Sequence, residues 1–275
     1  AWRSTADVLA AHRRMEGISS RVLSLEAVWD QFGDGLAHPV AIQRFLAYAL
    51  THWPEPRPRY VLLVGDGHWN TFASPRYPSP PLLMPPNLVF ADPYQGEVDS
   101  ASRLAAVVGE DALPDLAIGR ITADSAEELA AALAKTIAYE RAGAQAYQAQ
   151  HVFVTDCGGD ASGDFVASAE RLIRGALPRR LRADDFPGAC SGDPAAVERL
   201  QQAIVDQLNQ EGGLFASYVG HGAPNRWSTV PLFDTSHVGR LDNGRRLPIL
   251  LSWTCLDGYW PHPAVPSLVE DLVLG

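Results

Sequence analysis

Two short apolar runs, each carrying a reactive side chain close to a glycine, constrain the fold of this chain more than any other feature. The first run covers residues 217–222 and ends in His221 and Gly222, and the second covers residues 250–258 and carries Cys255. Runs of this kind are typical of buried parallel strands, whose carboxyl ends meet at one edge of a sheet. In an open α/β fold, ligands bind beyond that edge.

The two reactive side chains are suitably spaced to meet at such an edge. They are 34 residues apart (255 − 221), which is enough for one crossover between parallel strands. An imidazole beside a thiol favours the nucleophilic thiolate form of the cysteine. The pattern therefore favours a cysteine peptidase, in which the thiolate attacks an amide carbon and the imidazole protonates the leaving amine.

The rest of the chain alternates between strand-like and helix-like segments. This alternation predicts an α/β protein with a mainly parallel sheet that is flanked by helices. Further strands are expected at residues 21–28, 60–64, 87–91, 115–120 and 151–155, with a candidate edge strand at 181–186. Helices are expected within residues 1–20, from 39 to the prolines at 54–58, over 124–143, and from about 165, 194 and 267.

Composition excludes several classes of protein. The net charge of −10 and the scattered arginines argue against a nucleic-acid-binding surface. No apolar run approaches the ~20 residues that a membrane span needs. The first residues do not show a basic stretch followed by an apolar one, so any secretion signal is expected either to have been removed or never to have existed. The three cysteines have no metal-type spacing, and one is left over if two pair. Cys157 and Cys190 are interpreted as structural or incidental.

Five segments, in this order along the chain, resemble the gingipain family of cysteine peptidases. They are residues 60–66 (YVLLVGD), 114–120 (PDLAIGR), 136–140 (TIAYE), 218–222 (YVGHG) and 254–258 (TCLDG). The resemblance implies a caspase-like α/β fold of three layers, with residues 1–275 forming a peptidase catalytic domain. Within it, residues 1–145 would form a first subdomain, and residues 146–275 would carry the cysteine and the histidine.

The length of the chain departs from that family. Only 20 residues follow Cys255 (275 − 255), whereas gingipain-type domains continue with further core elements and usually an immunoglobulin-like domain. The chain is therefore expected either to be a fragment of a longer protein or to complete its sheet differently.

The resemblance also assigns roles to individual residues. It makes Cys255 the nucleophile and His221 the general base, and the main-chain N–H groups of Gly222 and Cys255 the oxyanion hole. An acidic residue close to the imidazole is expected at the end of strand 151–155. Asp156 fits that position best and Asp160 is the alternative, although a loop carboxylate that caps a turn would look the same.

Two residues are candidates for substrate binding. In arginine-specific gingipains, an acidic residue that follows the catalytic acid forms the floor of the primary pocket, and Asp164 is the loose match. A carboxylate there would bind arginine through two hydrogen bonds, and lysine less well. The alternative is that Asp164 caps the helix that begins near Phe165. Trp260, in the loop after Cys255, is expected either to line the substrate cleft or to belong to a rigid surface turn.

The resemblance further implies structural calcium, a protein or peptide substrate, and a secreted or cell-surface location. Candidate calcium ligands are the loop carboxylates Asp66, Asp92, Glu97, Asp99, Glu110 and Asp111, although none has the spacing of a dedicated calcium loop. Two other functions stay open. One is a sortase-like transpeptidase that passes the acyl group to an amine, and the other is an inactive caspase-like interaction module.

Overall fold

The structure, a computed structural model, describes residues 2–275 except 79, 160 and 174–177. The chain forms two compact units. The first extends to Ile137 and includes the later segment Tyr259–Ala264, and the second holds Ala138–Gly258 and Val265–Val273. The division lies within a helix, N-terminal to the subdomain boundary expected at residue 145. Nearly all of the predicted catalytic residues belong to the second unit, which is therefore described in more detail.

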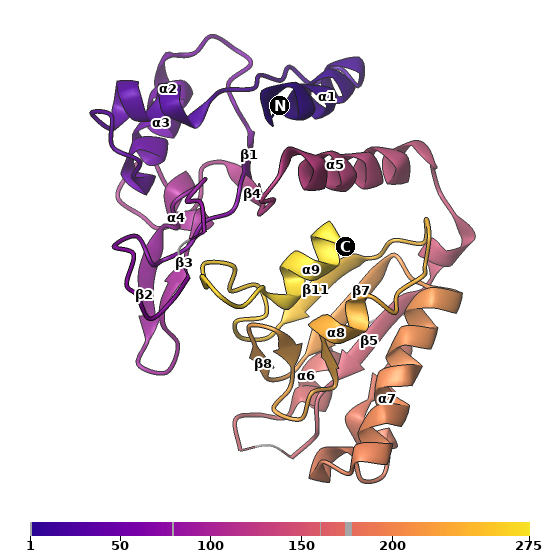
Figure 1. Cartoon of the computed structure of the whole chain (residues 1–275). Helices are drawn as coiled ribbons and strands as arrows, with labels where there is room; N and C mark the ends of the chain where they lie inside the picture. The colour runs from indigo at the N-terminus through magenta and orange to yellow at the C-terminus, as the bar shows by residue number, and fades with distance from the viewer. Residues whose placement is uncertain (1, 79, 160, 174–177) are drawn as a thin grey trace. The chain divides into compact units, whose positions relative to one another are not determined.

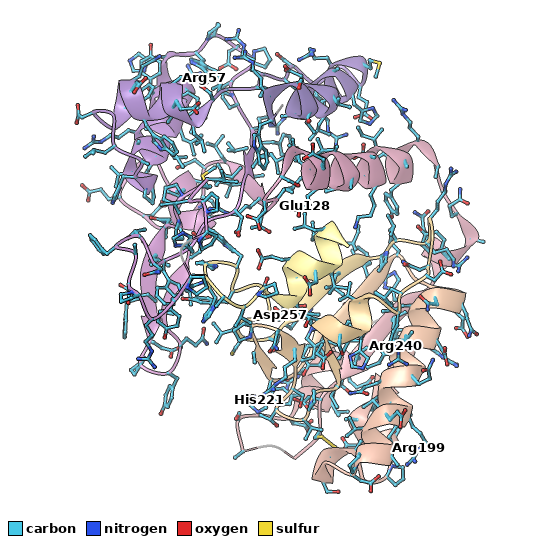
Figure 2. All side chains as sticks on the ribbon, viewed as in Figure 1. Arg57, Glu128, Arg199, His221, Arg240 and Asp257 are labelled. Atoms are coloured by element: carbon cyan, nitrogen blue, oxygen red, sulfur yellow. A yellow bond between two sulfur atoms is a disulfide. The ribbon has the colours of Figure 1, made fainter. Side chains whose placement is uncertain are left out.

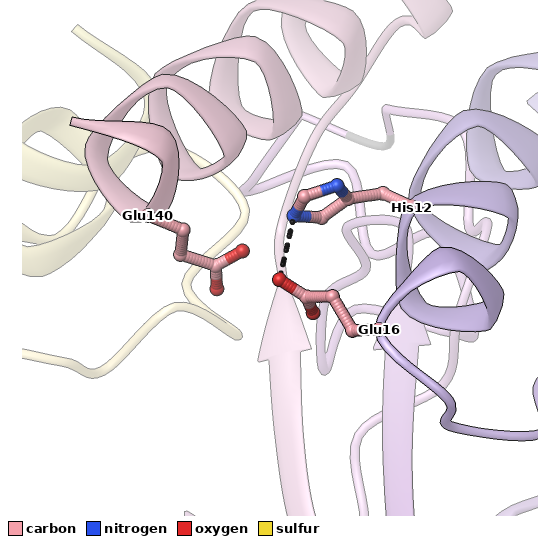
Figure 3. A group of neighbouring side chains, drawn as sticks. All are labelled: His12, Glu16 and Glu140. Atoms are coloured by element: carbon pink, nitrogen blue, oxygen red, sulfur yellow. Dashed lines mark ion pairs between the residues drawn. The ribbon is translucent and has the colours of Figure 1, made fainter. Parts of the chain in front are cut away.

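The first unit contains a parallel pair of strands and an antiparallel pair. Its elements are α1 (Trp2–Met15), α2 (Leu25–Phe32), α3 (Pro39–His52), β1 (Tyr60–Val64), β2 (Leu88–Asp92), β3 (Gly96–Asp99), α4 (Ala101–Ala105), β4 (Ala117–Ile121) and most of α5 (Ala126–Arg141). β1 pairs with β4, and β2 pairs with β3. On α1, His12 Nε2 lies 3.3 Å from a carboxylate oxygen of Glu16, one helical turn away (Figure 3).

The strand expected at residues 21–28 is wrong, because residues 25–28 are helical and residues 21–24 belong to no strand. α2 begins directly after Ser24, whose side chain accepts a hydrogen bond from the N–H of Ala27. A serine in this position satisfies one of the N–H groups that the first turn leaves unpaired. The apparent alternation of apolar residues spans too few positions to distinguish the period of a strand from that of a helix. The capping residue Ser24 is therefore the better indicator, and it marks the start of a helix.

The second unit is built around a four-stranded parallel sheet in the order β11-β7-β5-β6 (Figure 1). Its larger elements are β5 (His151–Thr155), α6 (Phe165–Leu172), β6 (Arg179–Arg182), α7 (Pro194–Asp206), β7 (Phe215–Val219), α8 (Thr235–Val238), β11 (Ile249–Trp253) and α9 (Leu268–Leu274). A small sheet contains β8 (Gly222–Ala223), β9 (Arg226–Trp227) and β10 (Phe233–Asp234). Short helical turns cover Ala146–Ala149, Ala183–Asp185, Ala189–Ser191 and Gln207–Glu211.

Successive side chains of β5 point to opposite faces of the parallel sheet, and each face packs against a helix. Val152 and Val154 pack in the same core cluster as Leu200 of α7. Phe153 points to the other face and packs with Ala169 of α6. Burial of a side chain such as Leu200 stabilises the fold by about 2 kcal/mol. The unit therefore has the expected three layers.

The expected edge strand exists, but its position in the sequence was wrong. β6 covers Arg179–Arg182 rather than residues 181–186, and it occupies the edge of the sheet beside β5. The chain then turns through Ala183–Asp185, where Asp184 accepts a hydrogen bond from the N–H of Gly158. That carboxylate bond links the turn to the loop after β5. Among the described residues, no helix combines the length and apolar character that crossing a membrane requires.

Candidate active site

The register of two neighbouring strands brings the histidine and cysteine segments together. β7 and β11 run parallel, and their last residues, Val219 and Trp253, lie opposite each other. His221 and Cys255 each follow two positions after the end of their strand. The main chains also touch beyond the strands, because a Cβ added to Gly222 would overlap the carbonyl oxygen of Cys255. Only glycine fits so close an approach. The sequence prediction that His221 and Cys255 lie at one sheet edge is therefore met by the backbone.

The segment that carries Cys255 is a tight turn beyond β11. Cys255 is exposed, and its carbonyl oxygen accepts a hydrogen bond of 2.9 Å from the N–H of Asp257. Leu256 between them has a φ of +62°, a left-handed conformation that non-glycine residues rarely adopt. Such backbone persists only where the surroundings hold it in place, and it is common at functional sites.

The main chain of His221 is held on both sides. Its carbonyl oxygen accepts hydrogen bonds from the hydroxyl of Tyr218 and from the N–H of Ser228, both at 2.7 Å. The imidazole ring meets Phe165 edge to face, with ring centroids 5.0 Å apart. His221 is half-buried in the second unit (Figure 2). The position of the imidazole is thus set by its neighbours rather than by solvent.

Asp156 is buried beneath the histidine segment, with 3% of its surface exposed. One carboxylate oxygen accepts hydrogen bonds from the His221 N–H at 3.1 Å and from the Tyr218 hydroxyl at 3.3 Å. The other accepts from the Ser228 hydroxyl at 2.7 Å and from the Cys157 N–H at 2.8 Å. These four donors match the capacity of a carboxylate. Asp156 therefore fixes the main chain of His221 by accepting a hydrogen bond from its N–H.

Burial and the neighbouring carboxylate raise the pKa of Tyr218 above its usual range. Desolvation is the larger cause, and the charge of Asp156 adds to it. The hydroxyl of Tyr218 consequently keeps its proton and serves as a permanent donor to His221 and Asp156.

The two remaining cysteines form a disulfide, Cys157–Cys190. The sequence left open whether they pair, and the bridge gives them a structural role. Because Cys157 follows Asp156 directly, the disulfide ties the loop after β5 to the turn at Ala189–Ser191. Of the three cysteines in the chain, Cys255 alone is outside it. Asp160, the alternative acid, lies outside the described residues.

Comparison with known proteins agrees with this geometry. A family model for peptidase family C25 matches residues 1–275. The chain belongs to this family.

Curated relatives of this C25 chain are gingipains. Gingipain R2 of Porphyromonas gingivalis is 28% identical over 220 residues, which cover 78% of this chain and 26% of the relative. Gingipain R1 of Porphyromonas gingivalis is 27% identical over 225 residues, which cover 78% of this chain and 19% of the relative. The chain thus spans about a quarter or less of the length of these relatives.

Solved structures show that the C25 chain has the gingipain fold. The complex of the pro- and mature domains of RgpB from Porphyromonas gingivalis matches with a TM-score of 0.68 at 23% identity. That match covers 96% of this chain and 55% of the solved one. The structure of the Arg specific cysteine proteinase gingipain R matches with a TM-score of 0.63 at 23% identity, over 88% and 51%. The caspase-like α/β fold expected from the sequence is confirmed.

Asp164 has the helix-capping geometry that was the alternative to a pocket role. It precedes α6, and its side chain accepts a hydrogen bond of 2.9 Å from the N–H of Ala167. One carboxylate oxygen is engaged in this cap. The contact of Asp164 with a substrate stays a prediction for this C25 chain.

Trp260 is largely buried within the first unit. The guanidinium of Arg120 lies over its ring at 4.0 Å, and its indole N–H donates to Asp99 at 3.3 Å. Burial lowers the pKa of Arg120, although the nearby carboxylate of Asp99 opposes that shift. This packing fixes the loop that Trp260 belongs to, while its proposed contact with substrate stays a prediction.

The six loop carboxylates stay candidate calcium ligands. Among the described residues, none of them belongs to a group of three acidic, histidine or cysteine side chains whose potential metal-binding atoms lie together. Asp92 caps a turn through the N–H groups of Tyr94 and Gln95, and Asp99 accepts from the N–H of Asn87. Calcium also takes main-chain carbonyl and water ligands, so structural calcium stays a prediction, and no step of the chemistry is assigned to the ion.

Four residues of this site, Tyr218, Trp227, Ser228 and Asp257, were not predicted from the sequence. Tyr218 and Asp257 stand inside the two conspicuous motifs, where they resemble a core residue and a turn residue. Trp227 and Ser228 follow the histidine at a distance of several residues. Ser228 has a φ of +66°, which no residue-type pattern indicates for serine.

Proposed function

We propose that this chain is the catalytic region of a cysteine peptidase that hydrolyses peptide bonds in proteins or peptides. One observation supports this most directly: Gly222 lies against the main chain of Cys255, at the ends of two parallel strands. Membership of peptidase family C25 supports the same reaction. The exposed thiol of Cys255 gives a substrate access to the nucleophile.

In this proposal, Cys255 is the nucleophile and His221 is the general base and acid. The imidazole takes the proton of the thiol, and the sulfur attacks the carbonyl carbon of the scissile bond. Negative charge develops on the carbonyl oxygen, where the N–H groups of Gly222 and Cys255 would stabilise it. The imidazolium then protonates the leaving amine, and the acyl group remains on sulfur as a thioester. A water activated by His221 hydrolyses the thioester and restores the thiol.

Asp156 is proposed to hold the histidine segment for this reaction. Its bond to the N–H of His221 fixes the backbone from which the imidazole projects. The Ser228 hydroxyl and the Cys157 N–H hold the carboxylate itself. Pre-organisation of this kind lowers the barrier because the imidazole need not be ordered during the reaction.

A preference for arginine, and to a lesser degree lysine, is proposed for the residue before the cleaved bond. A structural relative is described as an Arg specific cysteine proteinase. The second oxygen of Asp164 would bind a guanidinium. A contact of Trp260 with substrate is a separate proposal for the first unit. The disulfide Cys157–Cys190 supports a secreted or cell-surface location, because disulfides persist in oxidising compartments.

The reaction is tested by removing each of its two groups. We expect Cys255→Ala and His221→Ala each to reduce kcat for an arginine-containing peptide by a factor of at least about a thousand. Both variants should keep the circular dichroism spectrum of the parent. His52→Ala, which changes an exposed histidine on α3 of the first unit, serves as the matched control and should retain full activity.

Product analysis separates hydrolysis from acyl transfer. Mass spectrometry with an added amine acceptor would show free acid if water attacks the thioester, and an amide if the chain is a transpeptidase. Full activity in Cys255→Ala would reject the assignment of the nucleophile. A parent protein that binds peptide without cleaving it would favour an interaction module.

A further inference from the structure

A buried tryptophan joins the histidine segment to the cysteine segment. Trp227 is paired with Gly222 in the antiparallel ladder of β8 and β9, directly after His221. Its ring stacks on Tyr218, with centroids 4.5 Å apart and planes 7° from parallel. Its indole N–H donates a hydrogen bond of 3.1 Å to the carboxylate of Asp257. One side chain therefore contacts elements on both sides of the site.

Asp257 belongs to the turn that presents the nucleophile. Its N–H binds the carbonyl oxygen of Cys255 at 2.9 Å, and its own carbonyl accepts from the N–H of Val269 at 3.0 Å. Its carboxylate is buried and is labelled in Figure 2. Burial raises the pKa of Asp257, and the side chains of Ser252 and Trp227 and the main chain of Gly258 oppose that rise. A carboxylate in such a place is costly unless a donor satisfies it.

The strained residues of the site adjoin the two ends of this contact. Leu256 precedes Asp257, and Ser228 follows Trp227, and both have positive φ angles. The Ser228 hydroxyl and N–H reach Asp156 and the His221 carbonyl. An unusual backbone conformation needs support from its surroundings, and the Trp227–Asp257 contact is positioned to support both turns together with these hydrogen bonds.

We propose that Trp227 and Asp257 are positioning residues, which set the nucleophile turn against the histidine segment through the indole–carboxylate hydrogen bond. This rests on the proposed peptidase reaction. Neither side chain is assigned contact with substrate. Their effect passes through the backbone of residues 255–257 on one side and of residues 221–222 on the other. Loss of the bond should therefore impair turnover rather than substrate binding.

Trp227→Phe is the decisive variant, because it keeps an aromatic ring against Tyr218 and removes the indole N–H, together with the volume of one ring that the control variant must match. We expect kcat for an arginine peptide to fall roughly 10- to 100-fold, with KM unchanged. Phe233→Leu is the matched control. Phe233 is fully buried and lies 5.2 Å from Trp227 ring to ring, so its change disturbs the same core without touching Asp257. It should lower Tm while leaving kcat within about twofold.

Substitutions of the partner test whether the hydrogen bond itself matters. Asp257→Asn keeps an oxygen that can accept from the indole, whereas Asp257→Leu removes it at similar volume. We expect Asp257→Asn to retain most of kcat and Asp257→Leu to match Trp227→Phe. In the double variant Trp227→Phe/Asp257→Leu, the two losses should not multiply, because the same contact is removed once.

Hydrogen exchange gives a readout that needs no turnover. The amides of Asp257 and Val269, which bond within and onto the nucleophile turn, should exchange at least about tenfold faster in Trp227→Phe and should be unchanged in Phe233→Leu. Equal losses of kcat in Trp227→Phe and Phe233→Leu, or unchanged exchange at both amides, would overturn the proposal. If the parent cleaves no peptide but the exchange result holds, the positioning contact stands and the proposed reaction is rejected.

Discussion

Asp156 illustrates how a single buried residue can serve a site without facing the reacting atoms. Its two oxygens accept four hydrogen bonds, and the one to His221 comes from the main chain. The family resemblance predicted an acid at the end of β5, but not which atom of the histidine it would bind. Gly220 contributes at the same scale, because a Cβ there would overlap Tyr218 and Asp156.

The prediction for Asp164 belongs at the residue scale, because two roles compete for one carboxylate. As a helix cap it stabilises α6 by ~1 kcal/mol through the N–H of Ala167. As the base of a pocket it would bind arginine. We expect Asp164→Asn, which preserves capping, to leave Tm within a few degrees and to lower kcat/KM for arginine peptides at least about tenfold.

Asp193→Asn is the matched control, since Asp193 caps α7 in the same way through the N–H of Ala196. Its cleavage preference across a peptide library should equal that of the parent. An Asp164→Asn variant with the same preference as the parent would leave only the capping role.

At the scale of elements, α6 and β6 are joined by a cluster of one acid and two arginines. Glu170 of α6 accepts two hydrogen bonds from Arg180, at 2.7 and 3.0 Å, and one from Arg182 at 2.5 Å. These bonds, led by those from Arg180, lower the pKa of Glu170 to about 2. The cluster lies at the surface, so its contribution to stability is small.

The pH dependence of this cluster has a definite sign. The folded pKa of Glu170 is lowered, so the ionised carboxylate stabilises the fold above its unfolded pKa, and this is lost as the pH falls towards 2. We expect Glu170→Gln to be less stable than the parent at pH 7 by urea denaturation, with the difference shrinking below about pH 4.5. Glu198→Gln, on the exposed face of α7, should show little change. A difference that is constant with pH would contradict the assignment.

At the scale of the whole molecule, the chain carries separate hydrophobic cores in its two units. One cluster contains Leu46, Leu63 and Leu104 of the first unit, and the largest contains Val152 and Leu200 of the second. The disulfide and the candidate active site both belong to the second unit. The free energy of unfolding of the second unit is therefore the stability that matters for the candidate active site.

The disulfide is expected to stabilise the second unit alone. It closes a sequence separation of 33 residues, and restriction of the unfolded chain by such a loop is worth about 3–4 kcal/mol. We expect Cys157→Ser/Cys190→Ser to lower the hydrogen-exchange protection of β5 and β7 by about this amount. Protection of β1 and β4 should not change. An equal loss in both units would show that they unfold together.

The sequence by itself determined that a histidine and a cysteine follow two neighbouring strands, β7 and β11, that the main sheet is parallel, and where most helices begin. α7 and α9 begin where expected, with Asp193 and Ser267 as their caps, because caps and periodicity are local properties of the chain. Tertiary structure decided the Cys157–Cys190 pairing, the hydrogen bonds of Asp156 and the contact of Trp227 with Asp257. Apart from the bond from Cys157 to Asp156, each joins residues 30 or more positions apart, so it depends on strand register and loop path rather than on neighbouring sequence.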